Sequence, residues 1–136
     1  MVVRVKVHLE RGGKGLSSPA VVNSAYEAET CQVLLPIKVA RKLGIPLENA
    51  RRVPFETAGG LSFMYVLPDA LEVQLETERG GQRVKADVVI SEFERQILLN
   101  DKLAGKLGIR IEDVGEGLWS LRNDPKIRKS ERAKFW

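Results

Sequence analysis

A seventeen-residue pattern occurs twice in this chain of 136 residues. The segment LLPIKVARKLGIPLENA (34–50) aligns without gaps to LLNDKLAGKLGIRIEDV (98–114), and nine of the seventeen positions are identical. Each copy begins with aliphatic residues typical of a buried strand and continues into a short amphipathic helix that ends at Gly44 or Gly108. One explanation of the match is that any strand followed by a helix and a glycine cap favours the same residue types. The other explanation, which we predict, is a fold made of two similar halves.

The remaining segments have the patterns of strands. Residues 2–9 alternate apolar and charged side chains, and 51–58 is joined to 61–67 through Gly59 and Gly60 as a hairpin. The strongest hairpin pairs 70–78 with 83–90 across an RGGQ turn. Further strands are expected at 19–24, 33–36, 95–100 and 117–122, with helices at 37–45 and 101–108. Close-spaced strands with two brief helices predict a mainly β protein.

Length and composition predict one globular domain over residues 1–122, followed by a basic C-terminal tail over 123–136. The chain has no apolar run of membrane-spanning length and no signal-peptide pattern, so we expect a cytoplasmic protein with no membrane partner. Cys31 is the single cysteine and His8 the single histidine, which argues against a metal site, and no cofactor motif is present. Few Cys, Gln and Asn beside abundant Lys, Arg and Glu are typical of thermophilic proteins.

The net charge of +4 is concentrated in the tail, which carries five Lys or Arg against two Asp or Glu. A basic arm can bind nucleic acid, although such tails are more often simply solvated. The tail ends in Phe135 and Trp136, which are costly to leave in water. They either pack back on the domain or form a docking peptide for a partner.

Three stretches resemble the retropepsin-like aspartic peptidases: AVVNSAYEAETCQVLLPIKVARKLGI (20–45), FETAGGLSFMYV (55–66) and ILLNDKLAGKLGI (97–109). Members of that family carry Asp-Thr/Ser-Gly after a hydrophobic strand, then a glycine-rich flap hairpin, and an Ile-Leu-Leu-Gly-Asp element that opens the last helix. The GLWSLRNDP ending is similar to that of small archaeal proteins of the group. The resemblance implies an acid-protease half-barrel made of two similar halves, and a homodimer because this is a single lobe.

The resemblance places Asn23, Ser24 and Ala25 where the family has its catalytic triplet, so Asn23 stands at the position of the catalytic Asp. Two adjacent aspartates share one proton in that family, and one acts as general base on a water. An amide has no such proton to exchange, and a symmetric dimer would lose both carboxylates at once. Asn100 replaces another family Gly, and Asn tolerates a left-handed backbone better than most residues.

The same resemblance implies a groove for an extended peptide, with Tyr26 on its floor. Its flap would carry Ala58, Gly59, Gly60, Leu61 and Phe63. The function expected from these features is a catalytically inactive homologue that binds a peptide or protein as a homodimer.

Two alternatives remain open. The chain is an active aspartic endopeptidase, or one engineered to be inactive, if Asn23 replaces a native Asp. The segment VLLPIKVARKLGIPLENARRV (33–53) also resembles looped-hinge, swapped-hairpin DNA-binding proteins, and the positive charge would suit phosphate contacts. Nucleic acid is the less favoured partner because charge outside the tail is almost balanced.

Overall fold

The computed structural model describes residues 2–136, with the side chain of Thr57 excepted. This part of the chain contains ten strands, two short α-helices and one 3-10 helix. In chain order the elements are β1 (Arg4–Arg11), β2 (Lys14–Val22), β3 (Gln32–Pro36), α1 (Ile37–Lys42), η1 (Leu47–Asn49), β4 (Arg51–Thr57), β5 (Gly60–Leu75), β6 (Arg83–Ser91), β7 (Ile97–Leu99), α2 (Asp101–Lys106), β8 (Ile109–Asp113), β9 (Leu118–Leu121) and β10 (Asp124–Lys129). The expected mainly β architecture with two short helices is confirmed.

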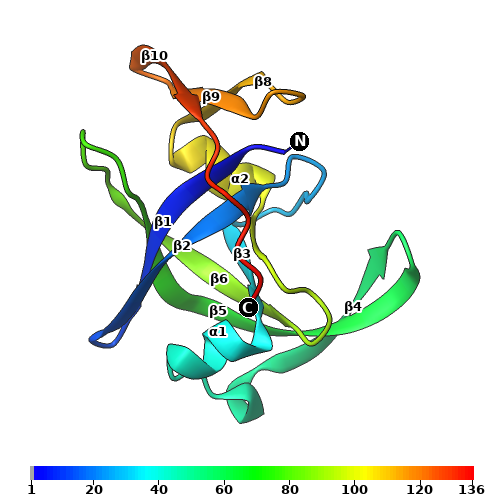
Figure 1. Ribbon diagram of the computed structural model, residues 1–136. Coiled ribbons are helices and arrows are strands. Elements are labelled where there is room, and N and C mark those ends of the chain that lie inside the picture. Colours follow the sequence, from blue (N-terminus) through cyan, green and yellow to red (C-terminus); the bar gives the residue numbers. More distant parts are fainter. Residues whose placement is uncertain (1) are drawn as a thin grey trace.

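Six strands close into a barrel in the order β1-β2-β7-β3-β6-β5 (Figure 1). The barrel closes because the second half of β5 pairs with β1, with Val7 opposite Leu75 and Leu9 opposite Val73. Strand β4 lies at the end of this sheet and pairs with the first half of β5. That pair, residues 51–66, is called the flap hairpin below, and it projects away from the barrel (Figure 1).

The sequence repeat is reflected in the pairing of the strands. Strands β3 and β7 run antiparallel with Leu34 opposite Leu98, its own counterpart 64 positions along. At the opposite seam Leu9 lies opposite Val73, which is also 64 positions along. Directly opposed residues of an antiparallel pair are related by a local twofold axis. Both seams therefore join residues separated by the 64-position offset of the sequence repeat.

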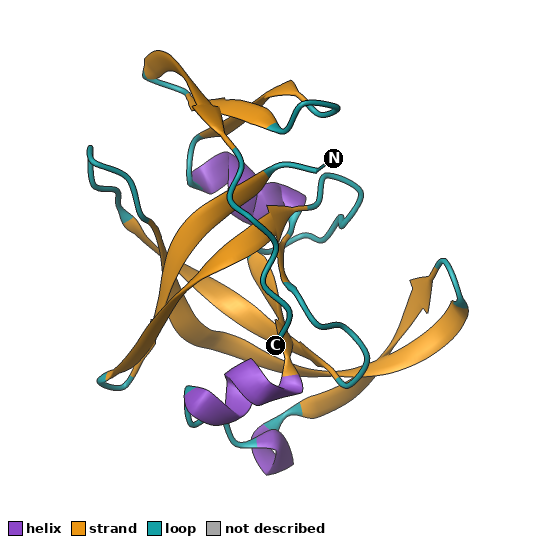
Figure 2. Cartoon of the chain, in the orientation of Figure 1, coloured by secondary structure: helices purple, strands orange, loops and turns teal. Residues whose placement is uncertain are grey.

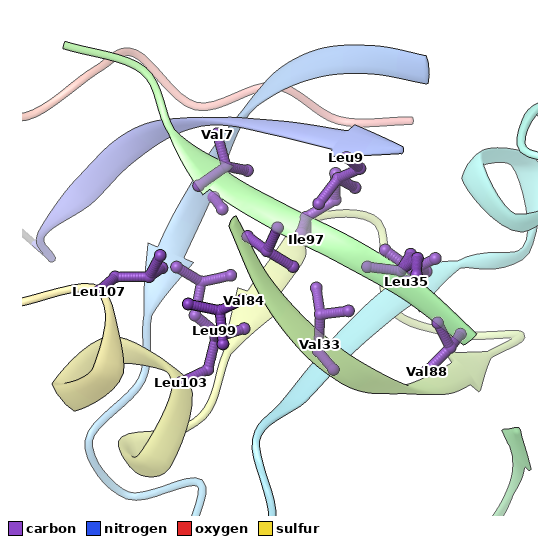
Figure 3. Close-up of a cluster of buried hydrophobic side chains, with 14 of the residues drawn as sticks. Val7, Leu9, Val33, Leu35, Val84, Val88, Ile97, Leu99, Leu103 and Leu107 are labelled. Atoms are coloured by element: carbon purple, nitrogen blue, oxygen red, sulfur yellow. The ribbon is translucent and has the colours of Figure 1, made fainter. Parts of the chain in front are cut away.

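The main core fills the interior of this barrel. Alternate residues of β1, including Val5, Val7 and Leu9, point inward and are fully buried, which explains the alternation of apolar and charged residues. Figure 3 shows Val7 and Leu9 in one cluster with side chains from β3, β6, β7 and the α2 region, namely Val33, Leu35, Val84, Val88, Ile97, Leu99, Leu103 and Leu107. The end of strand β6 is almost continuously apolar because both of its faces are buried. Its outward-facing Val89 belongs to a second apolar cluster under the flap hairpin.

Each helix follows directly on a barrel strand and ends at a glycine with a left-handed backbone, Gly44 (φ 68°) after α1 and Gly108 (φ 80°) after α2. That conformation is disfavoured for residues with a Cβ, so the glycines end the helices as the sequence predicts. Within residues 2–136 neither helix has the length and apolar character needed to cross a membrane.

Strand β5 differs from the expected pair of strands at 61–67 and 70–78. It is one strand of sixteen residues, interrupted by a bulge where its register against β6 shifts between Leu67 and Leu71. Asp69 lies in the bulge with φ of 47°, and its N–H donates to Asp87 Oδ1 at 2.8 Å. The Pro-Asp sequence indicates a turn, but pairing on both sides continues the strand, and the extra residues bend it from the flap hairpin into the barrel.

Strands β8 and β10 were not expected, and with β9 they form a separate three-stranded sheet. Residues 130–136 then run back along the barrel without regular structure (Figure 2). Trp136 packs against the main core, its ring N–H donates to Ser18 Oγ at 3.2 Å and its backbone N–H to Arg95 O at 2.8 Å. Of the two roles open for the terminal aromatic pair, packing back on the domain applies to Trp136, whereas Phe135 is 58% exposed.

An ion pair fixes the three-stranded sheet to the turn between β5 and β6. Arg128 donates to both carboxylate oxygens of Glu78, at 2.9 and 2.8 Å, and to Asp124 at 3.1 Å. The hydrogen bonds from Arg128 lower the pKa of Glu78 from its ordinary value of 4.5 to about 2. A depressed carboxyl pKa contributes stability that is present above the unfolded value and is lost as the pH falls through the folded value.

We therefore expect Glu78→Gln to flatten the loss of stability between about pH 4.5 and pH 2, the interval set by the two pKa values. The effect should be small because the carboxylate faces solvent, which screens the pair. Urea unfolding midpoints across this range would measure it, with Glu48→Gln as an exposed control of equal charge change. If the unfolding midpoints of the parent chain and of Glu78→Gln fell equally between about pH 4.5 and pH 2, Glu78 would not be the source of the pH dependence.

Candidate functional site

The loop that carries Asn23 (residues 23–31, called the Asn23 loop) begins where β2 ends and is fixed to the neighbouring strand. The backbone N–H of Asn23 donates to Leu99 O at 3.0 Å, and its carbonyl accepts from Tyr26 N–H at 3.1 Å. The side-chain Oδ1 accepts from the N–H of Ala25 at 3.2 Å, while Nδ2 has no hydrogen-bond partner among the residues described. The loop thus folds around the side-chain oxygen and leaves the amide nitrogen available to a ligand.

Tyr26 belongs to the same loop. Its hydroxyl donates to Gln32 Oε1 at 2.7 Å. Burial, and secondarily the charge of Asp87, raise the pKa of Tyr26 well above its ordinary value. The phenol therefore stays neutral at every physiological pH, and it can donate or accept a hydrogen bond but cannot serve as a general base.

Asn100 is fully buried and is hydrogen-bonded to the Asn23 loop through its side chain. Its Oδ1 accepts from Gln32 N–H at 2.9 Å and Leu103 N–H at 3.0 Å, and its Nδ2 donates to Thr30 O at 2.8 Å. The backbone of Asn100 is extended (φ −79°, ψ 177°), so the left-handed conformation considered for this position is wrong. Asn is suited to this position because one amide can cap α2 and also bind the Thr30 carbonyl of the loop and the Gln32 N–H at the start of β3.

A groove with a volume of about 540 Å³ opens between the Asn23 loop and the flap hairpin. Figure 1 shows the loop (light blue) and the hairpin (green) on the same side of the barrel. The floor of the groove is apolar and comes from three adjacent strands, with Leu34 on β3, Val89 on β6 and Leu98 on β7. Phe55 and Met64 of the flap hairpin extend this apolar surface.

The groove also contains three carboxylates and no Lys or Arg within the described residues. Glu27 comes from the Asn23 loop, Glu56 from β4 and Glu94 from the segment between β6 and β7. None of the three belongs to an ion pair in this part of the chain. The Oε1 atom of Glu94 accepts from the N–H groups of Arg95 and Gln96, at 3.2 and 3.4 Å, which fixes its position.

Of the site residues predicted from sequence, the groove brings together Asn23, Ala25, Tyr26 and Ala58. Ser24 is exposed on the Asn23 loop and does not line the groove. Gly59 lies with Ala58 in the turn at the tip of the flap hairpin, and Gly60 begins β5. The backbone of Gly60 has φ of 108°, which explains glycine at this turn.

Leu61 and Phe63 belong to the flap hairpin but do not line the groove. They border a separate hollow with Arg52 and Phe93, and the Arg52 guanidinium lies 4.1 Å from the centre of the Phe63 ring. Side chains of a strand alternate between faces, so Met64 faces the groove and its neighbour Phe63 does not. Both Leu61 (67%) and Phe63 (44%) are well exposed.

Sequence reasoning missed most of the groove's wall. Phe55 and Met64 could have been found from strand alternation, since the flap hairpin pairs Val53 with Met64 and Phe55 with Ser62. Leu34 and Leu98 could have been found from the repeat, because they occupy equivalent positions in its two copies. No local signal indicates Glu94, which reaches the groove only through the path of the chain between β6 and β7.

Metal ligands and the Cys31 thiol add no evident chemistry to this site. Within residues 2–136 no group of three or more His, Cys, Asp or Glu is arranged to hold a metal ion. Burial raises the pKa of the Cys31 thiol, which lowers its thiolate fraction and so its reactivity. The groove itself therefore offers hydrogen bonding at Asn23 and Tyr26, apolar contact and negative charge.

No protein-family model matches this sequence, and none of the curated proteins matches it either.

Proposed function

We propose that this protein is a peptide- or protein-binding module on a retropepsin-like half-barrel, that it acts as a homodimer, and that it does not cleave its ligand. The observation that carries the proposal is the groove of about 540 Å³ between the flap hairpin and the Asn23 loop. The sequence resemblance places Asn23 of this loop at the position of a catalytic Asp.

The arrangement around Asn23 supports the scaffold part of the proposal. The loop follows a buried strand, lies beneath a glycine-tipped hairpin, and is tied to β7 through Asn23 N–H and Leu99 O. The strand β7 leads straight into α2, as the Ile-Leu-Leu element does in the family that the sequence resembles. The side-chain oxygen of Asn23 faces the Ala25 N–H, which would hold a carboxylate at this position in a defined orientation.

The chemistry of the groove supports binding without catalysis. A peptidase of this type needs a base that takes a proton from water, and the amide of Asn23 cannot do so. Tyr26, the other polar group on the floor, is held neutral by its raised pKa. Both groups can still hydrogen-bond the main chain of a ligand.

The shape of the groove favours an extended peptide. Its floor crosses three adjacent strands, and β4 lies at the end of the seven-stranded sheet. A terminal strand can be extended by an added peptide strand, whose main chain supplies hydrogen bonds while alternate side chains enter apolar pockets. A DNA-binding role gains no support here, since carboxylates rather than Lys or Arg surround the groove.

The test combines association state with peptide selection. We expect a dimer in sedimentation at micromolar concentration, and enrichment of extended peptides from a displayed library of random heptapeptides. Ala25→Trp should fill the groove and weaken binding of a selected peptide at least tenfold, whereas Ala133→Trp, on the exposed C-terminal segment, should leave it unchanged. A monomer that enriches no peptide, or equal binding by the two variants, would refute the proposal.

A further inference from the structure

The charge of the groove is opposite to that of the whole protein. The chain carries 22 Lys and Arg against 18 Asp and Glu, yet the charged residues that line the groove are Glu27, Glu56 and Glu94. Elsewhere in the described structure three of the ten remaining glutamates form ion pairs, among them Glu10 with Arg83 at 2.9 Å and Glu78 with Arg128 at 2.8 Å. The distinctive feature of Glu27, Glu56 and Glu94 is that they share one groove that no Lys or Arg of the described residues lines, so they make it locally negative.

The three carboxylates line the groove together with its apolar floor and come from three separate elements. Glu27 lies on the Asn23 loop, Glu56 on β4 and Glu94 on the segment that leads to β7. Leu34, Val89 and Leu98 lie between these elements and belong to the apolar cluster under the flap hairpin. A ligand that covers the floor must therefore also approach carboxylates on more than one side.

We infer that the groove selects an extended peptide segment in which Lys or Arg flank apolar residues. This inference rests on the proposed function, because it names the ligand class of the same groove. Apolar side chains would cover Leu34, Val89 and Leu98, and cationic side chains at the ends of the segment would meet Glu27, Glu56 and Glu94.

The energetic reason is desolvation. A neutral or acidic peptide would take water away from unpaired carboxylates without replacing it, and an acidic one would add like-charge repulsion. A Lys or Arg side chain reaches over a neighbouring apolar residue with its methylene groups and pairs its charge at the rim. Charge complementarity of this kind decides specificity more than affinity, so related peptides should be separated mainly by their charge.

The test compares the peptides selected by three forms of the full chain from one displayed library of random heptapeptides. The forms are the parent chain, the triple variant Glu27→Gln, Glu56→Gln, Glu94→Gln, and the control Glu48→Gln, Glu116→Gln, Glu131→Gln. The control changes the net charge equally at exposed glutamates whose side chains form no ion pair in the described structure. Gln keeps the acceptor through which Glu94 binds the Arg95 N–H.

We expect the parent and control forms to enrich Lys and Arg on either side of apolar residues, and the groove variant to enrich apolar peptides without that preference. A labelled basic peptide from the selection should bind the groove variant about tenfold more weakly than the parent, in line with three partly exposed ion pairs. Raising NaCl from about 50 to 500 mM should weaken parent binding to a similar extent and affect the groove variant much less.

The outcomes separate the two proposals. Enrichment of peptides with no basic preference, or a basic preference that survives in the groove variant, overturns the ligand class and leaves the peptide-binding function standing. Failure of all three forms to enrich any peptide overturns both. Loss of the preference in the control as well as in the groove variant would show that net charge alone attracts the peptides, and would overturn the inference.

Discussion

Replacing Asn23 with aspartate is expected to produce a protease that cuts denatured protein substrates between pH 3 and pH 7, whereas the parent chain does not cut them. The Oδ1 atom of Asn23 already accepts the Ala25 N–H at 3.2 Å, so an aspartate of the same shape would be oriented by the same bond. Its second oxygen would take the place of Nδ2, which has no partner among the residues described, in a residue that lines the groove.

The expected gain is at least 100-fold over the parent chain, because a positioned general base contributes roughly 10² to 10⁴ in rate. In a homodimer the substitution introduces two carboxylates at once, and such a pair shares one proton and titrates in two steps. The rate should therefore pass through a maximum between pH 3 and pH 7 and be abolished by pepstatin.

Asn49→Asp is the matched control, since Asn49 is exposed and the substitution changes the charge equally. The comparison should use protein shown to be dimeric by sedimentation. Cleavage by the parent chain would contradict a non-catalytic function. A dimeric Asn23→Asp protein with no activity at any of these pH values would contradict the proposal of a retropepsin-like scaffold.

Asn100→Ala should lower the free energy of unfolding by about 3–5 kcal/mol. The substitution would leave the N–H groups of Gln32 and Leu103 and the carbonyl of Thr30 without the partners they have now. An unsatisfied buried polar group costs about 1–3 kcal/mol, and α2 would also lose its N-cap. Urea denaturation with an unchanged slope would measure the loss.

Asn49→Ala again provides the control and should change the free energy of unfolding by less than about 0.5 kcal/mol, because its side chain is exposed. A cost below about 1 kcal/mol for Asn100→Ala would show that water replaces the amide at this position. The Asn23 loop would then owe little of its shape to Asn100.

Much of the fold could be predicted because local patterns and tertiary contacts agree. Val5, Val7 and Leu9 alternate with charged residues along β1, and the same alternation places them inside the barrel. The repeat predicted two equivalent strand–helix units, and these units face each other across the Leu34–Leu98 pair. Where the expectation was wrong, the reason is tertiary: the two strands expected at 61–67 and 70–78 form one strand, β5, because pairing with β6 continues on both sides of a bulge.

The site was predictable only in part, because a groove is formed by segments that are distant in the chain. The Asn23 loop and Ala58 of the flap tip were recognisable as motifs, and four of the predicted positions do line the groove. Leu61 and Phe63 were grouped with them by hydrophobicity, but strand alternation turns them to the other side. The three glutamates that give the groove its charge look like ordinary solvent-facing residues in the sequence.

The sequence by itself determined the strand and helix content, the internal repeat and the chemistry available at position 23, because these depend on side-chain identity and on periods of two to four residues. Closure of the barrel through β1 and β5, the function of Asn100 as a capping and bridging amide, and the meeting of Glu27, Glu56 and Glu94 were decided by the tertiary structure. The physical reason is that a single strand or loop leaves most of its polar and apolar surface unsatisfied, and only long-range pairing fixes which groups satisfy one another.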